Sequence, residues 1–253
     1  MASTSEIVIA FDLYGTLLST ESIAKELASH FGDEKAQSIA ALWRRFQLEY
    51  TWRMNSMDLY KPFSEITNAS LKHALAESSV TLSEEYIGSL MKAYDSLGTF
   101  PDVPPGLKII SSSPNISAYV FSNGTDSMVS SSVKKSPALS SHASVFKDLI
   151  TVEEVRAYKP DPKVYQHLLK KVGKEKDAGR VWLVSGNPFD IVGARSVGMQ
   201  AAWVDRKGGH HGEGGWTDQL GTLAAGGPTI IVDGVEGAVE GIRNWVEDNG
   251  SRK

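Results

Sequence analysis

The fold is decided near the start of the chain, by the segment Ile7-Val8-Ile9-Ala10-Phe11-Asp12-Leu13-Tyr14-Gly15-Thr16-Leu17. Residues 7 to 11 are apolar and rich in β-branched types, which predicts a strand buried on both faces of a parallel sheet. Ligands gather at the carboxyl ends of the strands in an open α/β sheet. Asp12 is therefore expected at that edge, where Gly15 lets the backbone turn and Thr16 adds a hydroxyl. A lone aspartate after a strand is also typical of a turn or a helix cap, and the rest of the chain has to separate these interpretations.

Length and composition indicate a chain that folds around a sizeable core. Its 253 residues exceed one average domain, and 41% of them are hydrophobic. The net charge of −4 gives no reason to expect a nucleic acid or an anionic membrane as partner. The absence of cysteine excludes disulfides, cysteine nucleophiles and thiolate metal sites. No apolar run approaches the roughly 20 residues of a membrane span, and the N-terminus lacks a basic signal segment. We therefore expect a soluble, cytoplasmic enzyme.

A helical region is expected directly after the first strand, which we place at residues 7–13. Residues from about 20 to 97 contain no convincing strand. Within 34–57 the apolar side chains recur at helical spacing and form a stripe: Ile39, Trp43, Phe46, Tyr50 and Met54. Residues 83–97 predict another helix, which Ser83 would begin and Gly98 would close.

The remainder of the chain alternates as in a doubly wound parallel sheet. Apolar runs that predict strands lie at 116–121, 181–185, 200–204 and 229–232, with helices expected between them. We therefore expect an α/β core domain of residues 1–18 and 99–253, interrupted by a helical cap domain of residues 19–98. A cap inserted beside Asp12 would cover the site and exclude water from it.

Polar residues stand where the strand at 116–121 ends, in Ser122-Asn123-Gly124-Thr125-Asp126. Asp126 is expected to cap the next helix. A hydroxyl, an amide and helix-start N–H groups at one place suit a carboxylate or another oxyanion. An ordinary polar turn has the same composition and is the alternative.

Two other segments carry charged side chains at the start of a helix. Lys159 stands before a proline, so its backbone is expected to be extended and its ammonium group to face the site. A surface lysine beside a helix start is the alternative. Asp161 and Pro162 predict the cap and first residue of that helix. The strand at 181–185 leads into Ser185-Gly186-Asn187-Pro188-Phe189-Asp190, whose last carboxylate is a candidate helix cap.

A glycine-rich segment, Lys207-Gly208-Gly209-His210-His211-Gly212-Glu213-Gly214-Gly215, predicts a surface loop. Its adjacent histidines are not expected to bind a metal, because neighbours in sequence rarely share one ion and no carboxylate ligand is arranged with them.

Together these segments resemble the haloacid dehalogenase superfamily. In that family the first strand ends in a nucleophilic aspartate, the second in serine or threonine, a lysine follows, and an acidic loop closes the set. Here those positions correspond to Asp12, Ser122, Lys159 and the segment 185–190. The resemblance covers nearly the whole chain and implies an α/β, Rossmann-like core with an inserted helical cap.

Two positions favour dehalogenation over phosphate transfer within this superfamily. Its phosphatases carry a second aspartate two positions after the nucleophile and an acid early in the last loop, and they need Mg²⁺. This chain has Tyr14 and Gly186 at those positions. A phosphate ester needs a general acid for its alkoxide leaving group, whereas a halide leaves without a proton. The resemblance therefore implies no metal and no cofactor.

The cap sequence is most similar to the (S)-2-haloacid dehalogenases, also named L-2-haloacid dehalogenases or haloacid dehalogenase type II. The shared elements are the Trp-Arg and Gln-Leu-Glu-Tyr-Thr-Trp runs within residues 42–52. This resemblance implies that Arg44 lies over the site, where a guanidinium can stabilise the charge on a departing halide. Gly186 and Phe189 depart from the subgroup pattern, which usually has Ser and, in one branch, Trp there.

The resemblance implies a two-step reaction between a small 2-haloacid and water. Asp12 would attack the α-carbon opposite the halogen and form an ester, which water would hydrolyse to a 2-hydroxy acid of inverted configuration. The implied contacts are Arg44, Asn123 and Phe189 for the halide; Ser122, Lys159 and the backbone N–H groups at Leu13 and Tyr14 for the substrate carboxylate; and Asn187, Asp190, Thr16 and Ser185 around the water.

Three further expectations follow from the resemblance. Tyr165 matches a tyrosine of the subgroup one helical turn into the helix after Lys159, and core packing is its alternative role. The subgroup commonly pairs into homodimers, so we expect one here. The alternative functions are an atypical phosphatase acting on a small phosphate ester and a fold relative with another ligand.

Overall fold

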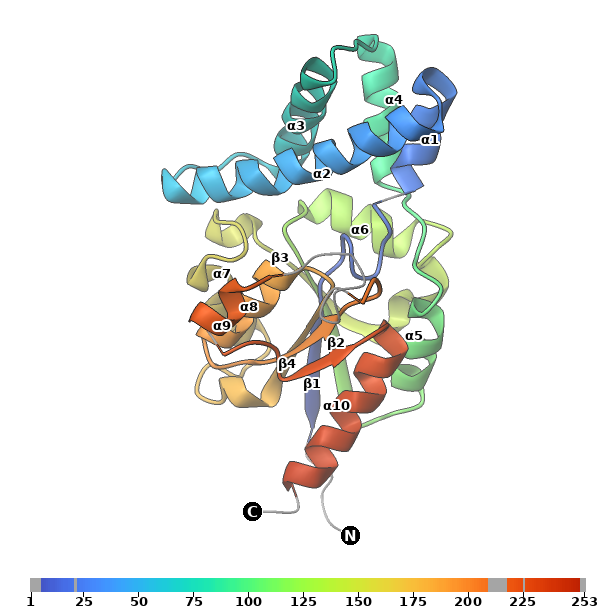
Figure 1. Ribbon diagram of the computed structural model, residues 1–253. Coiled ribbons are helices and arrows are strands. Elements are labelled where there is room, and N and C mark those ends of the chain that lie inside the picture. Colours follow the sequence, from blue (N-terminus) through green and yellow to red (C-terminus); the bar gives the residue numbers. More distant parts are fainter. Residues whose placement is uncertain (1–5, 21, 209–217, 225, 251–253) are drawn as a thin grey trace.

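The computed structural model describes residues 6–20, 22–208, 218–224 and 226–250. In this part of the chain six parallel strands form one sheet in the order β3-β2-β1-β4-β5-β6 (Figure 1). They are β1 (Ile7–Phe11), β2 (Ile116–Ser122), β3 (Phe146–Thr151), β4 (Val181–Ser185), β5 (Gln200–Val204) and β6 (Ile230–Val232). Because β1 lies between β2 and β4, the residue that follows it stands at the centre of the carboxyl edge.

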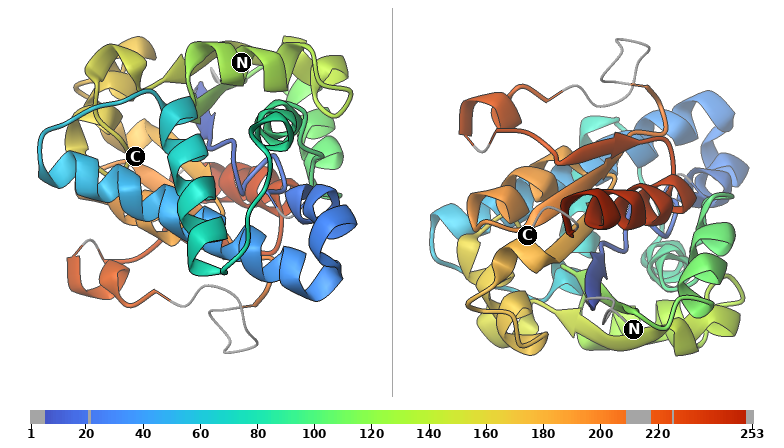
Figure 2. Two further views of the ribbon diagram at one scale, coloured as in Figure 1. Left: turned by 90° about the horizontal axis from the view of Figure 1, so that it is seen from above. Right: turned by 90° about the horizontal axis from the view of Figure 1, so that it is seen from below.

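Helices cover both faces of this sheet and complete the predicted doubly wound α/β core, which is confirmed. They are α5 (Val103–Ser111), α6 (Asp126–Lys134), α7 (Pro162–Lys171), α8 (Pro188–Ser196), α9 (Leu220–Ala224) and α10 (Val235–Gly250), with 3₁₀ turns at Ser140–Val145, Glu153–Val155 and Ala178–Arg180. α10 packs with α5 on one face, and α7 packs with α8 on the other (Figures 1 and 2). The layers therefore bury the central strands completely.

An unbroken apolar sequence explains which strands are predicted, including the edge strand β6, none of whose residues is fully buried. All of β1 and β4 is buried, as their continuous apolar sequences indicate. Burial of each large apolar side chain in such a strand stabilises the fold by about 2 kcal/mol. β3 was not predicted: it is an edge strand, and its Lys147 and Asp148 are exposed, so its sequence lacks an apolar run. Predicted strand ends differ by up to two residues, the largest difference being at β1, which ends at Phe11 rather than residue 13.

The cap consists of α1 (Ser22–Phe31), α2 (Asp33–Ser56), α3 (Phe63–Glu77) and α4 (Glu84–Tyr94). It lies above the carboxyl ends of the strands (Figure 1). The two connections to the core run side by side: Leu18 and Thr99 form an antiparallel bridge, and Ser19 N–H donates to the Gly98 carbonyl at 2.8 Å. The chain thus enters and leaves the cap at one narrow place.

The cap helices largely follow their sequence signals. The apolar stripe of α2 packs inward, with Ile39, Trp43 and Phe46 buried. Ser83 caps α4 as predicted, because its hydroxyl accepts from Tyr86 N–H at 3.2 Å. The predicted end at Gly98 is wrong. α4 ends at Tyr94, because the following residues leave the helix to pair with the first connection.

One side chain joins the far end of α2 to the core. Asn55 Nδ2 donates to the Tyr158 carbonyl at 2.6 Å, and its Oδ1 accepts from Tyr158 N–H at 2.9 Å. The Tyr158 ring is buried beneath the cap, stacked on Tyr60 with ring centres 5.2 Å apart. Asn55 therefore satisfies both backbone groups of a core residue that directly precedes Lys159.

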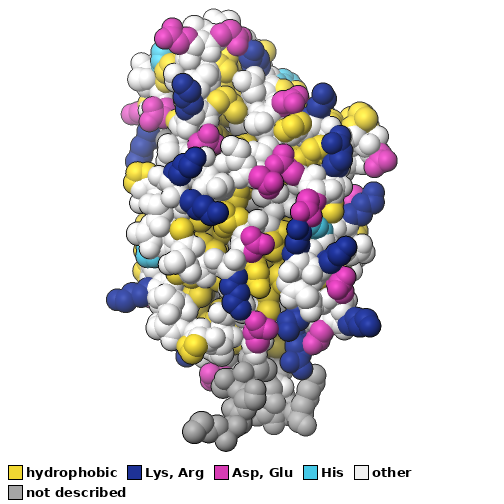
Figure 3. Space-filling model, turned by 180° about the vertical axis from the view of Figure 1, so that it is seen from behind, with side chains coloured by type: hydrophobic (Ala, Val, Ile, Leu, Met, Phe, Trp, Pro, Cys, Tyr) yellow, Lys and Arg dark blue, Asp and Glu magenta, His cyan; other side chains and the backbone are white. Residues whose placement is uncertain are grey.

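Three further observations concern possible membrane contact, surface charge and the predicted glycine-rich loop. Within the described ranges no helix combines the length and apolar character that crossing a membrane requires. On the face opposite to that of Figure 1, basic and acidic side chains are intermingled (Figure 3). The adjacent histidines of the glycine-rich segment, His210 and His211, lie outside the described residues.

The Asn55 contact generates a stability prediction. Asn55→Ala leaves the Tyr158 N–H without its partner, whereas the Tyr158 carbonyl keeps the Asp161 N–H at 2.9 Å. We therefore expect the free energy of unfolding to fall by about 2 kcal/mol, most of it from the unpaired N–H. Urea denaturation measures this change. Asn68→Ala, on helix α3 of the cap, is the matched control and should change it by less than about 0.5 kcal/mol. Equal stability of the two variants would show that Asn55 does not hold the cap to the core.

Candidate active site

The Asp12 carboxylate is buried at the carboxyl end of β1, and its two oxygens have different surroundings. Oδ2 accepts hydrogen bonds from the Thr16 hydroxyl and the Asn187 side-chain amide, both at 2.7 Å. The Ser185 hydroxyl lies 3.4 Å from the same oxygen. Oδ1 accepts from Lys159 Nζ at 3.0 Å. Oδ1 thus has fewer donors and keeps more of its lone-pair density available.

The turn after Asp12 is built around glycine. Gly15 has a φ of 83°, a left-handed conformation that glycine adopts without strain. Among the described residues, no hydrogen-bond acceptor faces the backbone N–H groups of Leu13 and Tyr14. Adjacent N–H groups of this kind suit an anionic oxygen. The turn therefore offers donors beside the Asp12 carboxylate.

Lys159 is a buried cation between two carboxylates. Its Nζ donates to Asp12 Oδ1 at 3.0 Å, to Asp190 Oδ2 at 2.7 Å and to the Phe121 carbonyl at 2.9 Å. Burial lowers the pKa of Lys159, but the two carboxylates more than offset this, so the pKa lies above its usual value of 10.5. The predicted ammonium group at the site is therefore charged at neutral pH.

Asp190 is not the helix cap that the sequence suggested. Asn187 holds the N-cap position of α8, and Asp190 lies inside the first turn with its carboxylate directed at Lys159. Its other oxygen accepts from the Tyr165 hydroxyl at 2.7 Å. Burial raises the pKa of Asp190 above 3.8 although Lys159 and Tyr165 oppose the shift. Asp190 is thus a better proton acceptor than an exposed carboxylate.

Tyr165 lies behind Asp190 and is fully buried. Gly193 makes room for it, since a Cβ there would lie 2.2 Å from the Tyr165 hydroxyl. Burial raises the pKa of Tyr165, so its hydroxyl remains a donor. This placement supports a role in holding Asp190, whereas contact with a substrate stays a prediction.

The segment after β2 turns toward Lys159. Ser122 Oγ accepts from Gly124 N–H at 3.0 Å, and Asn123 Oδ1 accepts from the backbone N–H of Lys159 at 2.9 Å. The prediction of Asp126 as helix cap is wrong. Thr125 caps α6 through its hydroxyl, because it takes the Met128 N–H at 3.2 Å and leaves Asp126 inside the helix.

Arg44 reaches from the cap helix α2 to the core. Its Nη2 donates to the Tyr14 carbonyl at 3.3 Å and to Asn187 Oδ1 at 3.2 Å. Its Nη1 donates to Gln47 Oε1 at 2.7 Å. In the described part of the chain no carboxylate lies within ion-pair distance of this guanidinium. Asn187 therefore links a cap cation to the Asp12 carboxylate, to which its Nδ2 donates.

Aromatic side chains close the site. Tyr14 packs between Phe63 and Tyr94, with ring centres 5.9 Å and 5.4 Å away. Burial raises the pKa of Tyr14, so its hydroxyl stays neutral. Phe189 contacts Trp52 edge to face at 5.3 Å. These contacts give the site apolar walls from both the cap and the core.

The residues do not fit a Mg²⁺ site of the phosphatase kind. Tyr14 is a neutral aromatic side chain, and a Cβ on Gly186 would lie 2.6 Å from the Gly15 carbonyl, which leaves no space for an acid. The Lys159 ammonium already lies between the two site carboxylates. Among the described residues, no group of three or more His, Asp or Glu side chains could hold a metal.

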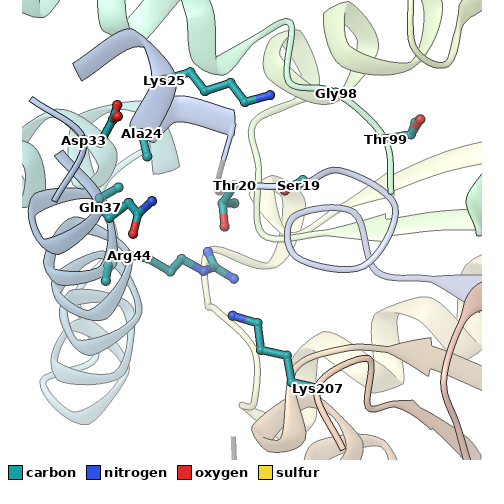
Figure 4. Close-up of a pocket in the computed structure, with 12 residues that line it drawn as sticks. Ser19, Thr20, Ala24, Lys25, Asp33, Gln37, Arg44, Gly98, Thr99 and Lys207 are labelled. Atoms are coloured by element: carbon teal, nitrogen blue, oxygen red, sulfur yellow. The ribbon is translucent and has the colours of Figure 1, made fainter. Parts of the chain in front are cut away.

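A cavity of about 890 Å³ opens beside Arg44, between the cap and the core (Figure 4). Lys25 from α1 and Lys207 from the core point their ammonium groups into it, and Asp33 faces it from α2. The described lining thus carries three cations and one carboxylate. Such a lining favours small anions.

The structure brings all seven predicted catalytic side chains into one hydrogen-bonded network: Asp12, Thr16, Arg44, Lys159, Ser185, Asn187 and Asp190. Sequence reasoning missed Gln47, which the structure places against Arg44. A signal was available, because residues three apart on a helix share one face. It also missed the Phe121 carbonyl, which accepts a hydrogen bond from Lys159 Nζ. No pattern of side chains in the sequence reveals a contact made by a backbone group.

Comparison with known proteins gives the family. A model described as haloacid dehalogenase-like hydrolase matches residues 8–198. The chain belongs to the haloacid dehalogenase-like hydrolase family. It is 32% identical over 212 residues to an (S)-2-haloacid dehalogenase of Pseudomonas sp. strain YL, covering 83% of this chain and 87% of the relative. It is also 32% identical over 198 residues to (S)-2-haloacid dehalogenase 4A of Burkholderia cepacia, covering 78% of this chain and 82% of that protein.

The fold gives the same family. The solved structure of the L-2-haloacid dehalogenase RSc1362 is 26% identical, with a TM-score of 0.82 over 95% of this chain and 100% of that chain. This haloacid dehalogenase-like hydrolase therefore shares sequence and fold over most of its length with proteins named as dehalogenases.

The buried ion network generates a prediction about pH. Lys159→Met leaves two buried carboxylates without their cation, so we expect the free energy of unfolding at neutral pH to fall by about 3 kcal/mol. Because the variant raises the pKa of Asp190 further, the loss should shrink as the pH falls and that carboxyl takes up a proton. In the wild type, the contribution of Lys159 should disappear only as the pH rises above 10.5. Urea denaturation of the wild type and of Lys159→Met over a pH series measures these changes in the free energy of unfolding.

The control is Lys163→Met, which removes an exposed lysine from the same helix start. It should change the free energy of unfolding by less than about 0.5 kcal/mol at every pH. A Lys159→Met variant as stable as this control would contradict the network.

Proposed function

We propose that this hydrolase acts on carbon–halide bonds, converting (S)-2-haloacids to (R)-2-hydroxy acids through an ester on Asp12 and without a metal. The observation that carries the proposal is the pairing of a buried carboxylate with a cap guanidinium that has only neutral partners. Asn187 connects the two groups, with hydrogen bonds of 2.7 Å to Asp12 and 3.2 Å from Arg44. The relatives reported above are named (S)-2- or L-2-haloacid dehalogenases.

In the proposed first step, Asp12 Oδ1 attacks the α-carbon of the substrate. A carbon–oxygen bond forms as the carbon–halogen bond breaks, and the halide leaves with the bonding electrons. Oδ1 is the oxygen that suits attack because it has one donor, whereas Oδ2 faces three. Attack from the side opposite the halogen inverts the centre.

The proposed contacts place the substrate between core and cap. The backbone N–H groups of Leu13 and Tyr14, with the Ser122 hydroxyl, bind the carboxylate. Arg44 stabilises the negative charge on the halide in a site closed by aromatic walls, where such a charge interaction is stronger than in water. Asn123 and Phe189 complete the halide contacts. A neutral Tyr14 is compatible with this step, because a halide needs no proton to leave.

In the proposed second step, water attacks the Asp12 carbonyl carbon. Negative charge develops on Oδ2, where the Thr16 hydroxyl and the Asn187 amide already donate at 2.7 Å. These donors stabilise the tetrahedral intermediate. Asn187 and Asp190 orient the water, and Asp190 takes its proton. The bond between the Asp12 carbonyl carbon and the substrate oxygen then breaks, and the proton taken up by Asp190 passes to that oxygen. The 2-hydroxy acid leaves with its inverted configuration unchanged.

Halide release from each enantiomer of 2-chloropropionate tests the proposal. We expect release from the (S) form alone, at the same rate with and without a chelator, and (R)-lactate as product. Asp12→Asn should lower the rate on the order of a thousandfold or more, because the nucleophile is lost. Asp248→Asn, an exposed change on α10, is the control and should retain the wild-type rate.

Two results would contradict the proposal. Release from both enantiomers at equal rates would exclude the stereospecific attack. The absence of release, together with Mg²⁺-dependent hydrolysis of a small phosphate ester, would instead support the atypical phosphatase.

A further inference from the structure

The guanidinium of Arg44 is oriented by a neighbour on its own helix. Gln47 lies three residues later on α2, and its Oε1 accepts from Arg44 Nη1 at 2.7 Å. Gln47 is almost fully buried, with 1% of its surface exposed, although it is a polar residue with no part in the proposed chemistry. Buried amides of this kind are retained when each of their polar atoms has a partner.

The orientation of the Gln47 amide is determined by the helices around it. Its Nε2 donates to Thr67 Oγ1 at 2.8 Å, and the Thr67 hydroxyl donates to the Phe63 carbonyl at 2.7 Å. Because the hydroxyl proton of Thr67 is engaged in this way, its oxygen can only accept from Gln47. The amide nitrogen must therefore face Thr67, and the amide oxygen must face Arg44. Tyr94 adds a second donor to that oxygen at 3.1 Å.

The partners of Arg44 also leave its positive charge without a counter-charge. Its acceptors in the described structure are the Gln47 amide, the Tyr14 carbonyl and the Asn187 amide, all of which are neutral. A carboxylate in the place of the Gln47 amide would fit the same space but would form an ion pair with the guanidinium and compensate its positive charge. Burial raises the pKa of Tyr94, so this donor stays neutral as well.

We propose that Gln47 is a positioning residue that acts through Arg44, holding its guanidinium in place for the departing halide without pairing it with a negative charge. This inference rests on the proposed function. It assigns Gln47 to the step in which the halide leaves, because Arg44 faces the leaving group only then. Hydrolysis of the ester takes place at Asp12 after the halide has gone, and Arg44 reaches that step only through its 3.2 Å hydrogen bond to Asn187. Hydrolysis should therefore depend on Gln47 far less than ester formation does.

The test separates the two steps. Gln47→Glu keeps the size of the side chain and adds a negative charge beside Arg44. Rapid-quench measurement with (S)-2-chloropropionate should show ester formation slowed on the order of tenfold or more. The hydrolysis of the accumulated ester should stay within about twofold of the wild-type rate. Gln47→Met removes the acceptor without adding charge, so ester formation should be slowed less than in Gln47→Glu.

The matched control is Gln166→Glu, which makes the same chemical change at an exposed position of helix α7. In this control the rates of ester formation and of ester hydrolysis should both equal those of the wild type. Near-ultraviolet circular dichroism confirms that each variant is folded. Equal slowing of both steps in Gln47→Glu would indicate a structural defect and would overturn the proposal. An unchanged rate of ester formation in Gln47→Glu would also overturn it.

Bromide binding to the resting protein gives a second readout that needs no turnover. Isothermal titration should show Gln47→Glu binding bromide at least about fivefold more weakly than wild type and Gln166→Glu. If the wild type formed no ester from any 2-haloacid, the proposed function would have failed. The bromide titration would still decide the inference, because equal affinities in wild type and Gln47→Glu would overturn it.

Discussion

The site depends on the buried ammonium group of Lys159, which lies between the carboxylates of Asp12 and Asp190. Each of these charges would be unstable in the core alone, because no water is there to solvate it. One cation and two carboxylates leave one negative charge, and the Arg44 guanidinium faces it from the cap. The strand ends, the Lys159 backbone and the cap all have to be in place before this balance exists. The fold is therefore constrained by the same contacts that hold the Asp12 carboxylate in place.

Helix α2 determines where the cap rests. It carries Arg44 and, about three turns later, Asn55, and both side chains reach the core. Arg44 contacts the turn after β1, whereas Asn55 binds the backbone of Tyr158, the residue before Lys159. A rigid helix held at two points leaves the cap little freedom to rotate. The Arg44 guanidinium and the Lys159 ammonium group are thus aligned by one element.

The sequence predicts strands with an unbroken apolar run better than strands without one, at the edge of the sheet as well as inside it, as β6 shows. β1 and β4 are continuous apolar runs, so their strands and the polar residues after them could be placed. β3 was missed because its exposed Lys147 and Asp148 interrupt its apolar residues. Asp126 and Asp190 were interpreted as caps, but Thr125 and Asn187 hold those positions, because local capping preferences do not distinguish neighbours that are both suitable. The Asn55 contact with Tyr158 spans 103 residues, a separation at which sequence periodicity carries no information.

The most direct test of the account asks which oxygen enters the product. In a single turnover with excess enzyme in ¹⁸O-labelled water, the account predicts a 2-hydroxy acid that carries unlabelled oxygen from Asp12. Mass spectrometry of the peptide that contains Asp12 should then show one ¹⁸O atom in its carboxylate. A labelled product together with an unlabelled Asp12 would mean that water attacks the substrate directly. That result would contradict the aspartyl ester on which the account rests.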